Sequence, residues 1–260
     1  MNHEHHDYAV IGVGALAEAI VTGLSEGQVP VPTIALSPRG RDRSARLSAR
    51  YANVHVAASN QEAVSAAATV LLSVRPQDAE EVLGPLVFRE DHRVVSVMAR
   101  HSLDDLAGLV SPASVIVRAI PNPAVARRKG ITPLHPGGSV ADALFDGLGG
   151  AMIVDEERLL SAVSVASATV ATHFAYLRTV SRWLADHGVR ADVADRYIAS
   201  IFAGTGSELE GVTDLEPLAA SHATMGGLNE RIEQTMRDAG VFDTVRGALD
   251  DLYSDLRADS

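Results

Sequence analysis

The chain has 260 residues, 47% of them apolar, so it can bury a substantial core in one or two domains. Its formal charge of -11 argues against a nucleic-acid partner, because phosphate backbones are bound by basic surfaces. The absence of cysteine excludes disulfides, thiolate metal sites and cysteine nucleophiles. We find no signal peptide and no apolar run of the roughly 20 residues that a membrane span needs, so we expect a cytoplasmic protein without a membrane partner.

The first half of the chain alternates strand-like and helix-like segments, which is typical of a doubly wound α/β fold with a parallel sheet. Stretches 61–68 and 78–83 have helical character, and Ser102 with Asp105 is typical of a capped helix start. The predicted strands are short and lack polar alternation, as strands buried on both faces do. They are residues 8–13, 33–37, 55–57, 70–74, 94–98 and 114–119.

After about residue 150 the pattern changes to long, alanine-rich stretches with no strand candidates. Apolar residues recur there at three- and four-residue spacing, as at Phe174, Leu177 and Val180. We therefore predict a Rossmann-type dinucleotide-binding domain over residues 1–154 and an all-α substrate and dimerisation domain over residues 155–260. The apolar stripes exceed what one short bundle needs, so we expect a homodimer or higher homo-oligomer through the helical domain.

The most informative motif is Gly12-x-Gly14-x-x-Ala17, between the first predicted strand and a helical pattern. Amides at a helix N-terminus and the positive end of its dipole together form a phosphate cradle. Gly12 permits the tight turn, Gly14 allows a pyrophosphate to approach the backbone, and Ala17 lets the helix pack closely on the strand. The order of strand, turn and helix predicts dinucleotide binding.

The residues after the second predicted strand indicate which dinucleotide is bound. A site for NAD places an acid there, which binds the ribose hydroxyls. This chain instead has Ser37, Arg39, Arg41 and Arg43, and guanidinium groups pair well with a 2′-phosphate. We therefore favour NADPH over NADH, with Ser37 and Arg39 as contacts; Arg41 and Arg43 could instead only solvate the next helix.

No hydrolase or metalloprotease motif is present, and no spacing of histidines and acids predicts a metal site. Isolated histidines, such as His101 and His222, are more typical of surface or structural positions. A hydride-transfer enzyme needs no such group, because the nicotinamide supplies the chemistry and the protein supplies orientation.

Taken in order, several segments resemble the pyrroline-5-carboxylate reductase family over nearly the whole chain. They are IGVGALAEAI at 11–20, NQEAV at 60–64, LSVRPQ at 72–77, RAIPNPA at 118–124 and TMGGLNE at 224–230. The resemblance implies a reductase that passes a hydride from NADPH to the C=N bond of a cyclic imino acid, as in proline biosynthesis. It also implies a helical domain that interlocks with a partner subunit.

The resemblance also implies site residues. Asn229 stands where the family has the threonine that hydrogen-bonds the imine nitrogen, and the turn before it offers backbone amides to a substrate carboxylate. The expected cofactor-binding residues are Gly12, Gly14, Ala15, Leu16, Ser37, Arg39, Asn60, Val74, Arg75 and Pro76. The expected substrate-binding residues are Arg100, Asn122, Thr224, Gly226, Gly227 and Leu228.

The chain departs from the family mainly in its substrate half. The family's SGSGPAY segment should fall near residues 167–174, where neither its glycines nor its proline are present. Arg100 follows Ala99 where the family has Ala-Gly, which implies either an added anchor for an anionic substrate or a rotated loop. Two alternatives therefore stay open: a reductase of this architecture for another imine or an oxo acid, and an NADPH-binding protein without catalysis. The only lysine, Lys129, is not placed as in hydroxyacid reductases.

Overall fold

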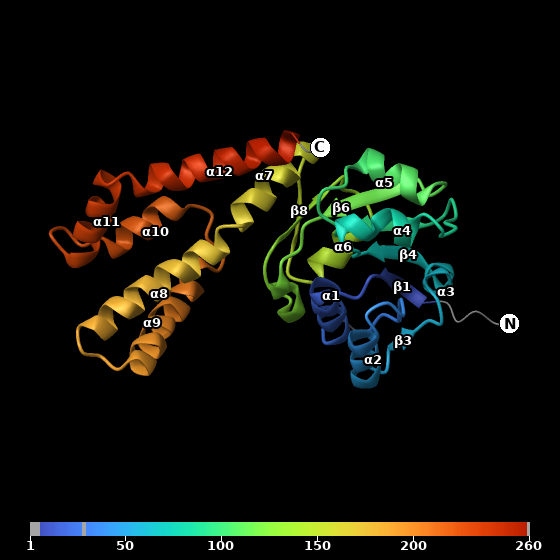
Figure 1. The fold of residues 1–260 in the computed structure, drawn as a ribbon, viewed down its shortest axis with the longest axis horizontal. Coiled ribbons are helices and arrows are strands. Elements are labelled where there is room, and N and C mark those ends of the chain that lie inside the picture. The colour runs from blue at the N-terminus through green and yellow to red at the C-terminus, as the bar shows by residue number, and fades with distance from the viewer. Residues whose placement is uncertain (1–5, 28–29, 259–260) are drawn as a thin grey trace. The chain divides into compact units, whose positions relative to one another are not determined.

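The protein is described here by a computed structural model that covers residues 6–27 and 30–258. The chain divides into two compact units (Figure 1), one of Met1–Ser164 with Leu256–Ser260 and one of Val165–Asp255. The first unit thus continues about ten residues beyond the boundary predicted at residue 154. Each unit is described by itself.

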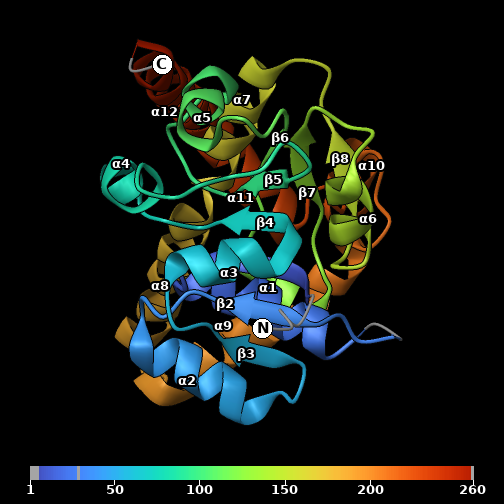
Figure 2. The same ribbon diagram turned by 90° about the vertical axis from the view of Figure 1, so that its right-hand side faces the viewer.

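The first unit is built on an eight-stranded sheet in the order β3-β2-β1-β4-β5-β6-β7-β8 (Figure 2). All neighbouring strands are parallel except β6 and β7. The strands are β1 (His6–Ile11), β2 (Ile34–Leu36), β3 (Val54–Val56), β4 (Ala67–Leu72), β5 (Arg93–Ser96), β6 (Val115–Ala119), β7 (Thr132–His135) and β8 (Ala151–Ile153). The predicted fold class, α/β followed by all-α, is confirmed, and each of the six predicted strands overlaps one of β1 to β6.

The sequence patterns missed the last two strands, β7 and β8. β8 (Ala151–Ile153) lies within the predicted first domain, before the helical stretches. The prediction of a parallel sheet is wrong at one place, because β7 runs antiparallel to β6. The link from β6 to β7 holds only a 3-10 turn, η2 (Pro123–Arg127), whereas a parallel neighbour needs a crossover element. β7 contains Pro133, which weakens its strand signal.

Helices cover both faces of the sheet, so its strands have little polar alternation. They are α1 (Ala15–Ser25), α2 (Arg41–Arg50), α3 (Asn60–Ala66), α4 (Ala79–Leu83), α5 (Leu103–Val110) and α6 (Val140–Asp146), with a 3-10 turn η1 (Pro76–Asp78) before α4. Along β1, Val10 packs into a core with residues of α1 and α6, whereas Ala9 and Ile11 pack into a second core with residues of α3, α4 and α5. Successive side chains therefore enter opposite cores.

The second unit is helical, as predicted. The first unit ends within α7 (Glu157–Ser167). The second unit then contains α8 (Val170–Asp186), α9 (Ala191–Gly206), η3 (Ser207–Leu209), α10 (Leu215–His222), α11 (Leu228–Asp238) and most of α12 (Val241–Ala258). The Ser181 hydroxyl on α8 donates to Asp195 on α9. Large apolar side chains stay exposed on this unit, among them Phe174 at 62% and Trp183 at 58%.

One stretch corrects the statement that no apolar run is long enough for a membrane span. Residues Glu157–Asp186 form a helical stretch that is long and apolar enough to cross a membrane, judged by length and composition alone. One such stretch is weak support for a membrane protein, since it spans the α7–α8 turn and also contains polar residues such as Ser161, Thr169 and His173. An apolar surface that packs against another protein chain has the same composition.

A buried histidine before β5 predicts a pH dependence of stability. His92 is fully buried and its Nδ1 accepts a hydrogen bond from the Arg89 amide at 3.0 Å. Burial, with Arg89 nearby, lowers the pKa of His92. The folded chain therefore resists the proton that the unfolded chain accepts below about pH 6.5, and stability is lost as pH falls through that value.

We predict that His92→Asn, which keeps an acceptor near the Arg89 amide, flattens the fall of the free energy of unfolding between about pH 6.5 and 5. Urea denaturation at several pH values measures it. The exposed His55→Asn serves as the control, because it removes a histidine without removing a buried one. Identical pH dependence in wild type and His92→Asn would contradict this reading of the buried ring.

Candidate functional site

The glycine turn after β1 has the geometry of a phosphate cradle. Gly12 has a φ of 88°, and a Cβ there would lie 2.7 Å from the carbonyl oxygen of Ser73. Gly14 is the N-cap of α1, and a Cβ there would meet no atom within 4 Å. Ala17 is fully buried. The turn thus needs glycine at position 12 and leaves open space before the first amides of α1 for a pyrophosphate.

Ser37, predicted to contact the phosphate, lies fully buried just after β2. Its hydroxyl accepts a hydrogen bond from the Gly12 amide at 3.0 Å, and its carbonyl accepts one from the Ser44 hydroxyl at 3.1 Å. The side chain therefore ties the end of β2 to the glycine turn. A direct contact with a cofactor stays a prediction.

The three arginines after β2 have different surroundings. Arg39 has 43% of its side chain exposed and faces Asp78, with 3.4 Å between Nη2 and Oδ2. Arg43 instead pairs with Glu18 on α1 at 2.7 Å. The side chain of Arg41 lies outside the described residues. Among the described side chains of this segment, Arg39 is the cation that faces the loop after β4.

The other predicted cofactor residues lie at the same edge of the sheet, because parallel strands end together. Asn60 opens α3, the helix after β3. Val74, Arg75 and Pro76 follow β4, with Val74 buried and the Arg75 side chain 71% exposed. These positions surround the carboxyl end of β1, where open α/β sheets bind ligands.

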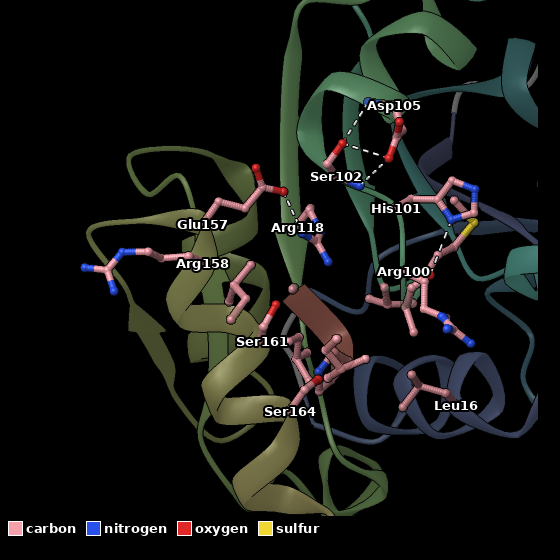
Figure 3. A pocket seen from close by; sticks show the side chains of 18 residues that line it. Leu16, Arg100, His101, Ser102, Asp105, Arg118, Glu157, Arg158, Ser161 and Ser164 are labelled. Carbon is pink, nitrogen blue, oxygen red and sulfur yellow. Dashed lines mark hydrogen bonds and ion pairs between the residues drawn. The ribbon is translucent and has the colours of Figure 1, made fainter. Parts of the chain in front are cut away.

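A pocket of about 450 Å³ lies farther along this edge, at the carboxyl ends of β5 and β6 (Figure 3). Leu16 at the start of α1 forms one wall, and Met98, Ile120 and Leu160 add apolar surface. The polar groups of the pocket come from Arg100, His101, Arg118, Ser161 and Ser164. The structure thus brings the predicted residues Leu16 and Arg100 to one pocket. Asn122 does not line it; its side chain caps η2 by accepting from the Ala124 amide at 2.8 Å.

Arg100 has an unusual backbone conformation for an arginine. Its φ is 67°, in the left-handed region that favours glycine. Directly after it, Ser102 and Asp105 form the predicted cap of α5, and the Ser102 hydroxyl lowers the pKa of Asp105. The loop therefore turns back sharply into a fixed helix start. Backbone conformations of this kind in non-glycine residues occur often at functional sites, so the binding role of Arg100 stays a prediction.

An ion pair that the sequence did not reveal forms another wall of the pocket. Arg118 on β6 is 13% exposed, and its Nη1 lies 2.5 Å from Oε1 of Glu157 on α7. The same oxygen accepts the amide of Leu103 at 2.8 Å, so Glu157 links β6, α5 and α7. The only signal in the sequence was a single charge, Arg118, inside an otherwise apolar strand.

Among the described residues, no cluster of histidines and acids could hold a metal ion.

The Gly-Gly turn before α11 differs from the expectation. The Gly226 amide donates to Glu230 Oε2 at 2.6 Å, and the Gly227 amide donates to the Thr224 carbonyl at 2.7 Å. Both amides that were expected to meet a substrate carboxylate thus have acceptors within the turn. Asn229 donates to the His222 carbonyl at 2.9 Å, and Leu228 is 76% exposed. The roles of these residues stay predictions.

Glu157 allows a direct test of the pocket wall. We predict that Glu157→Ala lowers the free energy of unfolding by about 2–3 kcal/mol, because it leaves the Arg118 guanidinium buried without its counter-ion. The neighbouring Glu156→Ala should lower the free energy of unfolding much less, since Glu156 pairs with Arg158 at the exposed surface. Urea denaturation measures both, and equal losses in the two variants would show that the Arg118 pair has no special weight.

Residues 7–100 match the protein-family model described as NADP oxidoreductase coenzyme F420-dependent. The pyrroline-5-carboxylate reductase of Mycobacterium leprae is 27% identical over 84% of this chain and 78% of the relative. That of Haemophilus influenzae is 31% identical over 66% of each chain.

The fold agrees with these sequence matches. The structure described as Plasmodium falciparum pyrroline carboxylate reductase with NADP bound has a TM-score of 0.79 to this chain, with 14% identity and 99% of each chain covered. At 14% identity the structural likeness establishes only the fold, whereas the sequence relatives establish the family. The chain belongs to the pyrroline-5-carboxylate reductase family.

Proposed function

We propose that the protein is an NADPH-dependent reductase of the pyrroline-5-carboxylate reductase type. The reaction adds a hydride to the C=N carbon of a cyclic imino acid, and the protonated imine nitrogen becomes the amine of proline. One observation in this chain supports the proposal in addition to its family: a pocket of about 450 Å³ begins at Leu16, two residues after Gly14 of the glycine turn. A hydride acceptor must lie next to the nicotinamide end of a dinucleotide, and this pocket is large enough for a small ring.

The chain's own residues have three tasks in this reaction. The apolar side chains of Leu16, Met98 and Ile120 give the ring a dry surface. Arg100 supplies a positive charge for the substrate carboxylate. The bound NADPH supplies the hydride, and a protonated imine is already electrophilic, so the residues need only hold the acceptor in place.

The coenzyme preference is part of the proposal. Gly12 and Gly14 fit a pyrophosphate because the turn is tight and open, and Arg39 fits a 2′-phosphate because it is exposed beside the end of β2. A carboxylate is the usual partner of an NAD ribose at the end of β2, and this segment begins with Ser37-Pro-Arg39 instead.

Arg39→Ala tests this preference. We predict that it weakens NADPH binding by about tenfold or more and changes NADH binding less than about twofold, because only the 2′-phosphate needs the guanidinium. Fluorescence titration of each coenzyme measures it. Arg43→Ala is the matched control, since Arg43 already pairs with Glu18. Equal weakening of NADPH and NADH by Arg39→Ala would remove Arg39 from the phosphate site.

Arg100 is proposed as the carboxylate anchor within the pocket. Its left-handed backbone is one that glycine adopts without strain, so Arg100→Gly should fold normally. We predict that this variant raises the KM for an anionic imine by about tenfold and changes the Kd for NADPH little. Steady-state kinetics and coenzyme titration measure the two effects. An unchanged KM would show that the arginine does not meet the substrate.

Asn229, in the Gly-Gly loop, stays the predicted partner of the imine nitrogen. Asn229 can donate and accept hydrogen bonds, as the family threonine does. Because Glu230 occupies the Gly226 amide, a substrate carboxylate can use that amide only after the Glu230 side chain turns away. This competition favours Arg100 as the principal anchor of the substrate carboxylate. The second candidate function is reduction of a substrate other than pyrroline-5-carboxylate.

The direct test of the proposed function is NADPH oxidation with pyrroline-5-carboxylate, followed by absorbance. Turnover with proline as product is the expected result. Turnover only with pyrroline-2-carboxylate, a piperideine carboxylate or an oxo acid would show the same architecture used for another acceptor. NADPH binding without turnover on any of them would indicate a binding protein and would overturn the proposal.

The assembly is also a proposal. Exposed Phe174 and Trp183 on α8 and exposed Tyr197 on α9 support a homodimer or larger homo-oligomer formed through the helical unit. Contact with a second copy of the chain would bury such apolar side chains, so the long apolar stretch of α7 and α8 does not require a membrane. A cytoplasmic location stays a prediction.

A further inference from the structure

One carboxylate, Asp78, lies between the two arginines that were predicted to bind the coenzyme. Arg75 approaches its Oδ2 with Nε at 2.9 Å and Nη2 at 2.8 Å. Arg39 approaches the same oxygen with Nη2 at 3.4 Å. Asp78 is 16% exposed, so this oxygen is a shared and largely enclosed counter-ion.

The two contacts differ in strength. Arg75 reaches Asp78 through two short hydrogen bonds from one guanidinium edge. Arg39 is at the outer limit of a hydrogen bond to Asp78, and its second acidic neighbour, Glu81, is 3.8 Å away and 79% exposed. Long, exposed ion pairs contribute little free energy. Arg39 can therefore leave Asp78 at little cost, whereas Arg75 stays.

The position of this cluster connects it with the coenzyme. Arg39 follows β2 and Arg75 follows β4, the two strands that flank β1. In a fold of this type the adenosine half of a dinucleotide lies across the carboxyl ends of these strands. A 2′-phosphate bound by Arg39 would take the place at its guanidinium that Asp78 now holds.

We propose that Asp78 is a specificity-determining residue: its carboxylate occupies Arg39 in the empty site and is replaced there by the 2′-phosphate of NADPH. This inference rests on the proposed coenzyme. A phosphate carries more negative charge than a carboxylate and offers three acceptor oxygens, so it displaces Asp78 from Arg39. The 2′-hydroxyl of NADH has no charge and leaves the Arg39–Asp78 contact in place.

Two consequences follow from this exchange. The Asp78 carboxylate competes with the 2′-phosphate for the Arg39 guanidinium, so Asp78 moderates the preference for NADPH. Its removal should tighten the binding of 2′-phosphorylated ligands and leave other adenosine ligands unchanged. The gain should require Arg39 and should shrink at high salt, since the charges are near the surface.

The test is calorimetric titration of the full chain with 2′,5′-ADP and, separately, with 5′-AMP, which lacks the 2′-phosphate. We expect Asp78→Asn to tighten 2′,5′-ADP by about three- to tenfold at low salt, the size of losing one nearby charge in partly screened surroundings. We expect 5′-AMP to change by less than about twofold. Glu80→Gln is the matched control, because it removes an equal charge from α4 without touching these contacts. In an Arg39→Ala background, Asp78→Asn should give no gain.

The outcomes separate this inference from the proposed function. Weaker 2′,5′-ADP binding by Asp78→Asn would make Asp78 a support for the arginines and overturn the exchange. An equal gain from Glu80→Gln, or a gain that persists in Arg39→Ala, would reduce the effect to general charge and also overturn it. Wild-type protein that binds neither 2′,5′-ADP nor NADPH would overturn the proposed coenzyme as well.

Discussion

The close approach of the β1 end to the β4 end shapes the whole cofactor edge. A Cβ at Gly12 would lie 2.7 Å from the Ser73 carbonyl, so the chain can turn there only with glycine. The turn places the Gly12 amide on the buried Ser37 hydroxyl and aims the start of α1 at open space beside Gly14. β1, β2 and β4 are thereby joined at their carboxyl ends. The proposed phosphate site, the proposed coenzyme preference and the position of Leu16 in the pocket all depend on this junction.

Two carboxylates of the chain, those of Asp78 and Glu230, lie where ligand anions are expected. Asp78 is held by Arg39 and Arg75, and Glu230 accepts the Gly226 amide. A cationic or amide-rich site without a ligand is stabilised by an internal acceptor, because exposed donors otherwise rely on water. A ligand must then be a better acceptor than the carboxylate it replaces. Selectivity in such sites comes from the difference between two anions.

The cofactor half was more predictable than the substrate half for a physical reason. Gly12, Gly14 and Ala17 are local requirements of one strand, turn and helix, so their spacing in the sequence predicts their geometry. The place of Arg39 after β2 was likewise predictable, and its contact with a coenzyme stays a prediction. The Arg118–Glu157 pair joins residues far apart in the chain, and no local pattern announces such a contact.

The errors in the fold have similar origins. β7 and β8 were missed because Pro133 and the paired glycines before Ala151 weaken the strand signal. The register of β7 is set by pairing with β6, and that of β8 by pairing with β7. The Gly-Gly turn looked like an open cradle because the sequence could not show that the Glu230 carboxylate folds back onto Gly226. In each case the deciding partner is set by tertiary structure.

The measurement that bears most directly on the proposed reaction is the fate of the hydride. NADPH carrying deuterium at C4 of the nicotinamide is incubated with the protein and pyrroline-5-carboxylate, and the product is analysed by mass spectrometry. Direct transfer to the C=N carbon predicts one deuterium at C5 of proline, from one face of the labelled nicotinamide only. Proline without deuterium from either labelled face, or no proline at all, would contradict hydride transfer to this imine.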